Sequence, residues 1–165
     1  MFVITADQIG GRSGTEQATE DPGAALALVL QRAREREWFI GLGIGDTAGA
    51  EQLARDAAMS ARKRPTRFAL SIAAGRLPDS DLLEPLIDLL LQLRARRTPE
   101  GWALADLLQT GITQVEAASQ LGVTPQAVSL RAQNAHLRLE TAAIRSLVEL
   151  LDAAGAPPQR RTEAL

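Results

Sequence analysis

Residues 113–138 carry the most specific structural pattern in this chain and read TQVEAASQLGVTPQAVSLRAQNAHLR. Its first part predicts a short helix, because Thr113 is a good N-cap and Glu116, three residues later, can complete a capping box. Gly122 lies where this helix must stop, since glycine readily adopts the left-handed conformation found at helix ends. A short helix followed by a tight glycine turn is therefore expected.

A second helix is expected to start directly after this turn. Thr124 is a favourable N-cap, and Pro125 is a favourable first residue of a helix. Ala118 is small enough to let two helices cross closely, and Val128 continues the apolar side of the second helix. This combination is the pattern of a helix-turn-helix, which lays its second helix in the major groove of DNA. A plain helical hairpin, in which Gly122 only ends a helix, is the alternative.

The predicted second helix carries polar groups of the kinds that recognise DNA. Amide and hydroxyl side chains can donate to and accept from base edges. The side chains expected to read bases are Gln126, Ser129, Gln133 and Asn134. Those expected to hold phosphates are Thr124, Arg131 and Arg138. An amphipathic segment at residues 99–110 predicts a supporting helix, and the whole pattern predicts double-stranded DNA as the partner.

The charge of this region argues against tight DNA binding by a single copy. Residues 97–140 contain three arginines and four acidic residues, whereas DNA binding relies on Lys and Arg to neutralise phosphates. Dimerisation, or basic residues from elsewhere, would have to add affinity. Two basic runs could supply it, although a solvated surface is the commoner role of such runs. They are Arg62, Lys63, Arg64 and Arg67, and Arg94, Arg96 and Arg97.

The sequence as a whole predicts an α+β protein, with a small N-terminal sheet and its helices followed by an all-helical helix-turn-helix region. Residues 8–21 are rich in Gly, Ser, Thr and charge and are interpreted as loop. The predicted strands are 2–6, 38–44 and 67–72, and the predicted helices between them are 24–36 and 51–64. The predicted divisions are an α+β domain at 1–76, a helical domain at 79–154 and a disordered tail at 155–165.

Two long helical segments raise the question of a partner chain. Residues 79–97 are rich in leucine on more than one face, with Asp81 and Glu84 as the expected capping residues. Residues 126–154 keep helical spacing without Gly or Pro, which predicts a helix that continues or kinks near residues 140–141. A helix that is apolar over more than one face is deeply buried or shared with a second chain. We favour a homodimer built from these two segments, and a monomer that packs both internally is the alternative.

Composition narrows the chemistry open to the chain. The 165 residues include no cysteine and one histidine, His136, which excludes disulfides, thiolate metal sites and histidine triads. Asp7 and Asp46 form the only obvious carboxylate pair for a metal, and capping of a turn is the favoured role of Asp7. The glycines of GLGIG (residues 41–45) fit a helix packed on a strand better than nucleotide binding. We expect no enzyme, no cofactor and no metal.

Targeting signals are not evident in the sequence. The N-terminus lacks the basic region and long apolar core of a signal peptide. No apolar run reaches the length of a membrane span. A cytoplasmic location without a membrane partner is therefore expected.

Two family resemblances extend these expectations. The segment from RTPEGW (residues 97–102) to QAVSLR (residues 126–131) is similar to helix-turn-helix regions of bacterial regulators, in the style of region four of sigma factors. The stretches MFVITADQ (residues 1–8) and WFIGLGIG (residues 38–45) resemble proteins of the SatD family. The resemblance implies a bacterial transcriptional regulator whose N-terminal domain is laid out like a nucleotide cyclase. Such a layout implies a second strand bearing Gly-Asp-Glu, where residues 11–20 are interpreted here as loop.

Two other functions compete with transcriptional control. One is a nucleotide-sensing or cyclase-like N-terminal domain. The other is a protein-interaction module that keeps a degenerate helix-turn-helix.

Overall fold

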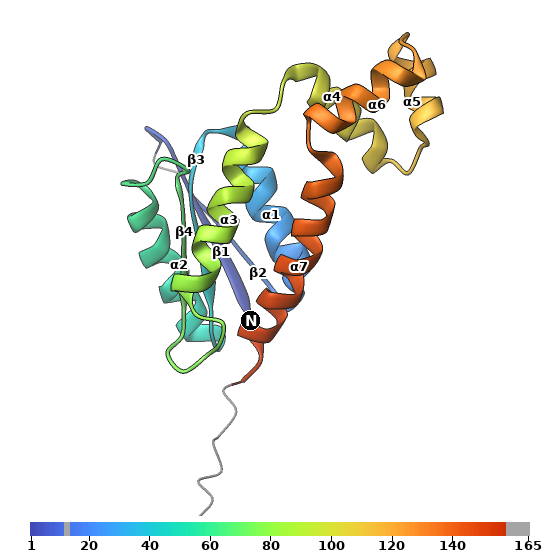
Figure 1. Cartoon of the computed structure of the whole chain (residues 1–165). Helices are drawn as coiled ribbons and strands as arrows, with labels where there is room; N and C mark the ends of the chain where they lie inside the picture. Colours follow the sequence, from blue (N-terminus) through green and yellow to red (C-terminus); the bar gives the residue numbers. More distant parts are fainter. Residues whose placement is uncertain (12–13, 158–165) are drawn as a thin grey trace, which may run out of the picture. The chain divides into compact units, whose positions relative to one another are not determined.

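The computed structural model describes residues 1–11 and 14–157, which belong to two compact units. The first unit comprises Met1–Leu91 together with the chain from Arg145 onward, and the second comprises Gln92–Ile144. The described residues form a four-stranded sheet and seven helices, so the predicted α+β class is confirmed (Figure 1). The two units are described separately below.

The division between the units differs from the one predicted. Helices α3 (Ser80–Ala95) and α7 (Leu137–Gly155) each run from one unit into the other. The prediction assigned both helices to a helical domain at 79–154, separate from the sheet. Most of α3 and the second half of α7 belong instead with the sheet, because their buried leucines help to form its core. The predicted disordered tail begins at the last residue of α7, and residues 158–165 lie outside the described part of the chain.

The sheet has the strand order β2-β1-β3-β4. Strand β1 (Phe2–Gln8) runs antiparallel to both β2 (Gly14–Thr19) and β3 (Trp38–Ile44), whereas β3 and β4 (Phe68–Ile72) are parallel. Strands β1, β3 and β4 lie where the sequence predicted strands. Helix α2 (Thr47–Ala61) connects the two parallel strands, as parallel neighbours require.

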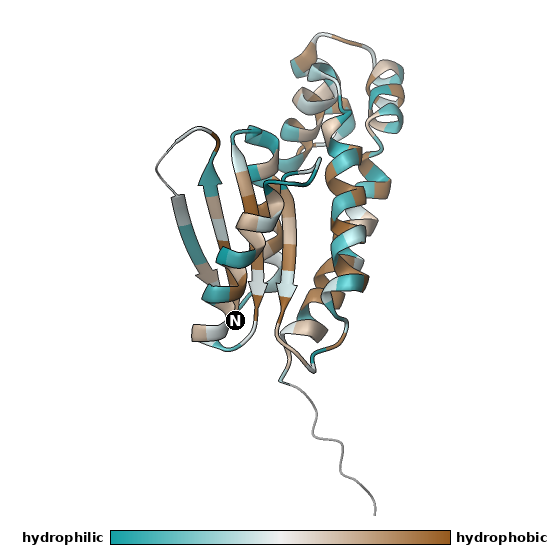
Figure 2. Ribbon diagram, turned by 90° about the vertical axis from the view of Figure 1, so that its left-hand side faces the viewer, coloured by the Kyte–Doolittle hydropathy of each residue, from teal (hydrophilic) through white to brown (hydrophobic). Residues whose placement is uncertain are grey.

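The predicted loop at residues 8–21 is wrong, because strand β2 lies within it. Its pairing with β1 runs from Phe2 opposite Thr19 to Asp7 opposite Gly14. The sequence GTEQAT lacks the apolar alternation of a half-buried strand, since β2 lies at the edge of the sheet and is mostly exposed. Figure 2 shows the contrast between this hydrophilic strand and the hydrophobic β3 and β4. A second strand is therefore present where the resemblance implied one, but it carries no Gly-Asp-Glu.

One face of the sheet is lined by small residues and is covered by α2. Facing the helix are Val3 and Ala69, with the glycines of β3 between them. A Cβ atom at Gly41 would lie 2.1 Å from the Ala54 carbonyl oxygen of α2. A Cβ atom at Gly43 would lie 2.1 Å from the Ala50 carbonyl oxygen, one turn away in the same helix. Glycine alone lets the helix backbone approach so closely. The interpretation of these glycines as helix packing is confirmed.

The opposite face carries the large side chains of the same strands. Successive residues of a strand point to opposite faces, so the residues between the small ones lie on this side. They are Phe2, Ile4, Ile40, Leu42, Ile44, Phe68 and Leu70, all buried. Helix α1 (Pro22–Glu35) packs on this face, and α3 lies on the same side, away from α2 (Figure 1). Asp21 caps α1 by accepting a hydrogen bond of 2.8 Å from the Gly23 N–H.

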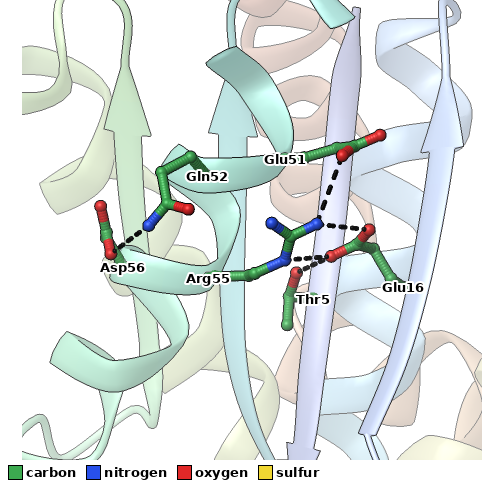
Figure 3. Close-up of polar contacts among 6 residues, drawn as sticks. All are labelled: Thr5, Glu16, Glu51, Gln52, Arg55 and Asp56. Carbon is green, nitrogen blue, oxygen red and sulfur yellow. Dashed lines mark hydrogen bonds and ion pairs between the residues drawn. The ribbon is translucent and has the colours of Figure 1, made fainter. Parts of the chain in front are cut away.

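Polar contacts attach the edge strands to neighbouring helices. On β2, the Glu16 carboxylate accepts a hydrogen bond of 3.1 Å from Arg55 Nε of α2 and one of 3.3 Å from the Thr5 hydroxyl (Figure 3). The bond with Glu16 raises the pKa of the Arg55 guanidinium, and Glu51 adds to the effect. Exposed ion pairs of this kind contribute little energy individually, so the backbone ladder, not Arg55, holds β2 in place.

Strand β4 is protected on its outer edge by side chains of α3. The Leu70 N–H donates to the Glu84 carboxylate at 2.8 Å, and the Ile72 N–H donates to the Ser80 hydroxyl at 2.9 Å. The prediction that Glu84 caps its own helix is therefore wrong, because its carboxylate is bound to the strand. Asp79 caps the helix instead by accepting from the Leu82 N–H at 3.1 Å. Unpaired edge groups invite association with other chains, and these two side chains satisfy two of them.

In the described residues, no helix is long and apolar enough to span a membrane.

The close approach of α2 to β3 predicts a graded response to added methyl groups. Gly41→Ala places a Cβ against helix backbone and should lower the free energy of unfolding by at least about 1–3 kcal/mol, as overpacked cores do. Gly45→Ala, whose nearest atom would be 3.2 Å away, should cost less. Urea denaturation followed by circular dichroism measures both. Equal stability of the two variants would contradict this account of the glycines.

Candidate nucleic-acid interface

The second unit contains the predicted helix-turn-helix. Its helices are α4 (Pro99–Gln109), α5 (Gln114–Leu121) and α6 (Pro125–Asn134), and α6 packs against both of the others. The core of this unit is built from Leu104, Ala117, Ala118 and Val128. Ala118 is buried where the helices cross, as its small size predicts. The two helices, the turn and the supporting helix therefore lie where the sequence placed them.

Local hydrogen bonds explain why α5 starts where it does. The Thr113 hydroxyl accepts from the Glu116 N–H at 3.2 Å, and the Glu116 carboxylate accepts from the Thr113 N–H at 2.7 Å. This is the predicted capping box. The bond from the Thr113 backbone, and secondly that from its hydroxyl, hold the pKa of the Glu116 carboxyl below its ordinary value. The cap is therefore charged and intact at neutral pH.

The turn between the two helices has the predicted geometry. Gly122 adopts a φ of 63° and ψ of 34°, the left-handed conformation that favours glycine. The Val123 N–H donates to the Ala118 carbonyl at 3.0 Å and closes the corner. Thr124 then caps α6 by accepting from the Ala127 N–H at 3.2 Å. The Thr124 hydroxyl oxygen is thus used within the fold, and its O–H remains the group that could donate to a phosphate.

Helix α6 has one buried side and one exposed side. Val128 is buried and Ala132 half-buried, and both pack into the core of the unit. The four residues predicted to read bases all lie on the exposed side: Gln126, Ser129, Gln133 and Asn134. Residues three and four positions apart are neighbours on a helix surface, so these side chains form one continuous polar face. Leu130 lies on the same face and was not singled out from the sequence.

The two arginines predicted to hold phosphates differ in their surroundings. Arg138 is exposed near the start of α7. Arg131 is half-buried and lies close enough to Glu100 to attract its carboxylate. The pKa of Glu100 is lowered chiefly by its own backbone N–H, then by the Thr98 hydroxyl, and to a smaller extent by Arg131. Arg138 is therefore the more accessible of the two cations.

The end of α6 differs from prediction. The helix neither runs straight on nor kinks near residues 140–141, because it ends at Asn134. Ala135 caps it, and His136 adopts a φ of 53° before α7 begins at Leu137. His136 is exposed, and its carbonyl accepts from the Glu140 N–H at 2.9 Å as the first bond of the new helix. Neither Gly nor Pro marks this break in the sequence.

A buried charge cluster lies behind the break. Both Arg94 and Arg97 donate to the carboxylate of Glu140, and the three residues are only 8%, 9% and 6% exposed. Arg97 also donates to the carbonyl of Ala135 at 3.2 Å. The guanidinium groups lie 4.9 and 4.5 Å from the ring centre of Trp102, which is a favourable cation–π arrangement. Arg97 Nε and Nη1 have no hydrogen-bond partner in the described part of the chain.

The second basic run, Arg94, Arg96 and Arg97, is interpreted from the sequence as a solvated surface or as a source of DNA affinity, and for Arg94 and Arg97 this cluster contradicts both interpretations. Arg94 and Arg97 are neither solvated nor available to phosphates, and only Arg96 of that run is exposed. The sequence could not reveal this, because Glu140 is more than forty positions away from either arginine. The exposed surface of the second unit consequently remains close to neutral.

The first basic run is largely engaged within the first unit. Arg62 pairs with Asp7 at 3.1 Å, and Arg64 pairs with Glu84. Arg67 donates to a backbone carbonyl at 2.8 Å. Asp7 therefore has a cation as its partner. All four residues of the run are exposed, as expected for a solvated surface, and its three arginines have partners within the unit.

The other carboxylate considered for a metal has a structural role. Asp46 caps α2 by accepting from the Gly49 N–H at 2.8 Å. Within residues 1–11 and 14–157, no group of three His, Asp or Glu side chains could hold a metal ion.

Comparison with known proteins adds no identification. No protein-family model matches the chain, and no curated protein or solved structure matches it significantly. The resemblances to sigma factor region four and to the SatD family therefore stay predictions.

The buried cluster predicts that loss of one charge is costly. Glu140→Gln leaves two buried arginines without a counter-charge, and breaking a buried ion pair in this way costs about 3–5 kcal/mol. Glu149→Gln, an exposed change further along α7, is the matched control and should have almost no effect. Thermal and urea denaturation measure the difference. If the two variants were equally stable, Glu140 would not hold the cluster together.

Proposed function

We propose that this chain binds double-stranded DNA in a sequence-specific manner and acts in transcriptional control in the bacterial cytoplasm. The observation that supports the proposal is the capped helix-turn-helix with an exposed face on α6 that is polar apart from Leu130. A second helix of this kind fits the major groove, where each base pair presents a distinct pattern of donors and acceptors. Amide side chains such as Gln126 and Gln133 can bind adenine through two hydrogen bonds at once.

The near-neutral surface defines what kind of DNA binding to expect. Arg96, Arg131 and Arg138 are the arginines outside the buried cluster of the second unit, and three carboxylates accompany them. Because each neutralised phosphate adds a salt-dependent term to affinity, we expect a shallow salt dependence and weak binding by one copy. Base contacts, doubled by a second copy, would then supply most of the affinity.

In this proposal, two copies of the chain associate through their α3 helices. Leu82, Leu86 and Leu89 are 60%, 45% and 65% exposed and lie at helical spacing along one side of that helix. Adjacent exposed leucines on one helix face mark an interaction surface more often than isolated ones do. Dimers of helix-turn-helix proteins read two half-sites about one helical turn of DNA apart.

A protein-interaction module that keeps a helix-turn-helix is the second candidate. The scarcity of exposed cations favours it, because a surface without them lacks the electrostatic part of DNA affinity. The exposed leucines of α3 would then bind a different protein.

A direct experiment separates these functions. The purified protein is titrated at low salt against pooled genomic fragments, and the retained fragments are sequenced. Enrichment of a shared palindrome or direct repeat is the expected result. Salt-sensitive retention without enrichment would mean a non-specific DNA binder. No retention would favour the interaction module.

Within an enriched site, Gln126→Ala should weaken binding at one base position by about 1–3 kcal/mol and relax the preference there. The physical reason is that the amide at residue 126 is expected to pair with a base edge. Gln31→Ala removes an exposed glutamine of α1, outside both proposed surfaces, and is the matched control. Fluorescence anisotropy with single-base variants of the site measures the change. An equal loss on random DNA would show that Gln126 does not read a base.

The leucine surface predicts that a double change, Leu86→Glu with Leu89→Glu, abolishes the dimer. Two carboxylates facing the same positions of a partner would repel each other and leave charges desolvated. Met59→Glu changes a similarly exposed apolar side chain of α2, outside both helical segments expected to form the dimer, and should leave association intact. Sedimentation equilibrium of the three proteins measures the mass of the species in solution. A wild-type monomer at all concentrations would refute the proposed dimer.

A further inference from the structure

Leu130 is the large apolar side chain on the exposed face of α6. It is 57% exposed, and the polar residues Gln126 and Asn134 lie one turn away on either side of it. Ser129 and Gln133 complete its surroundings on the helix surface. A single exposed leucine is ordinary on a protein. The informative observation is therefore its place in the middle of the face proposed to enter the major groove.

The fold itself makes little use of this side chain. Val128 and Ala132 supply the contacts of α6 with the core, on the opposite side of the helix. Leu130 belongs neither to that core nor to the partly buried residues packed against it. Its apolar surface would be removed from water only by something that binds to this face of α6.

The chemistry of the major groove indicates what Leu130 would contact. The polar neighbours can match the donors and acceptors of base edges, whereas the C5-methyl group of thymine is the apolar feature displayed in the groove. We infer that Leu130 packs against a thymine methyl group and makes that position of the site specific for thymine. This inference rests on the proposed DNA binding and assigns a specificity-determining residue to it.

The test uses the full chain and the DNA site that selection enriches. Each thymine of the site is replaced in turn by deoxyuridine, which keeps the base-pairing groups and lacks only the methyl group. We expect one position in each half-site to bind the wild type about fourfold more weakly after replacement, the effect of leaving one methyl group unburied. Leu130→Ala should lose this discrimination, so that thymine and deoxyuridine bind equally well. Leu139→Ala, at an exposed leucine outside α6, should keep it.

The outcomes separate the inference from the function beneath it. The thymine contact is overturned if Leu130→Ala still binds thymine more tightly than deoxyuridine. It is also overturned if the wild type binds the two bases equally well at every position. Either result leaves the proposed DNA binding intact. A selection that enriches no site contradicts the proposed function, and the thymine contact falls with it. Circular dichroism of Leu130→Ala should match the wild type, because alanine is the best helix former and the replaced side chain is exposed.

Discussion

The second unit depends on one buried carboxylate. Glu140 neutralises Arg94 and Arg97 together, and through Arg97 it is linked to the carbonyl that ends α6. Isolated charges are expensive to bury, and a shared counter-ion makes their burial tolerable. Trp102 covers the same guanidinium groups. The cluster therefore lies directly behind the end of α6 and satisfies a backbone carbonyl there.

The first unit obeys a steric constraint of a different kind. Gly41 and Gly43 let the backbone of α2 lie directly on β3, and the alanines of α2 complete that contact. The large side chains of the sheet are then left to the opposite face. This asymmetry explains how a sheet of four strands buries residues on both faces, although its outer strand β2 contributes little to the core.

The electrostatic organisation bears on the proposed function. Arginines that suggested a phosphate-binding surface are used within the molecule, either in the buried cluster or in pairs such as Arg62 with Asp7. Non-specific DNA affinity relies on exposed cations, so little of it is expected here. A protein of this kind would depend on base contacts and on a second copy, which makes the polar face of α6 and the leucines of α3 its most informative surfaces.

Features that depend on near neighbours along the chain could be predicted from the sequence. The capping box at Thr113, the left-handed turn at Gly122 and the cap at Thr124 each involve residues within a few positions of one another. Their geometry is therefore encoded locally. The alternating glycines of β3 likewise predicted a closely packed helix, because glycine within a strand often marks the close approach of another backbone.

Features that join residues far apart in the chain could not be predicted from the sequence and are seen only in the folded structure. Strand β2 is a strand because β1 pairs with it, and its own residues lack an apolar period. The burial of Arg94 and Arg97 requires Glu140, and Arg97 also binds the Ala135 carbonyl at the break before α7. Such contacts are favourable only once the chain has folded, because in the unfolded chain these groups are separated and hydrated.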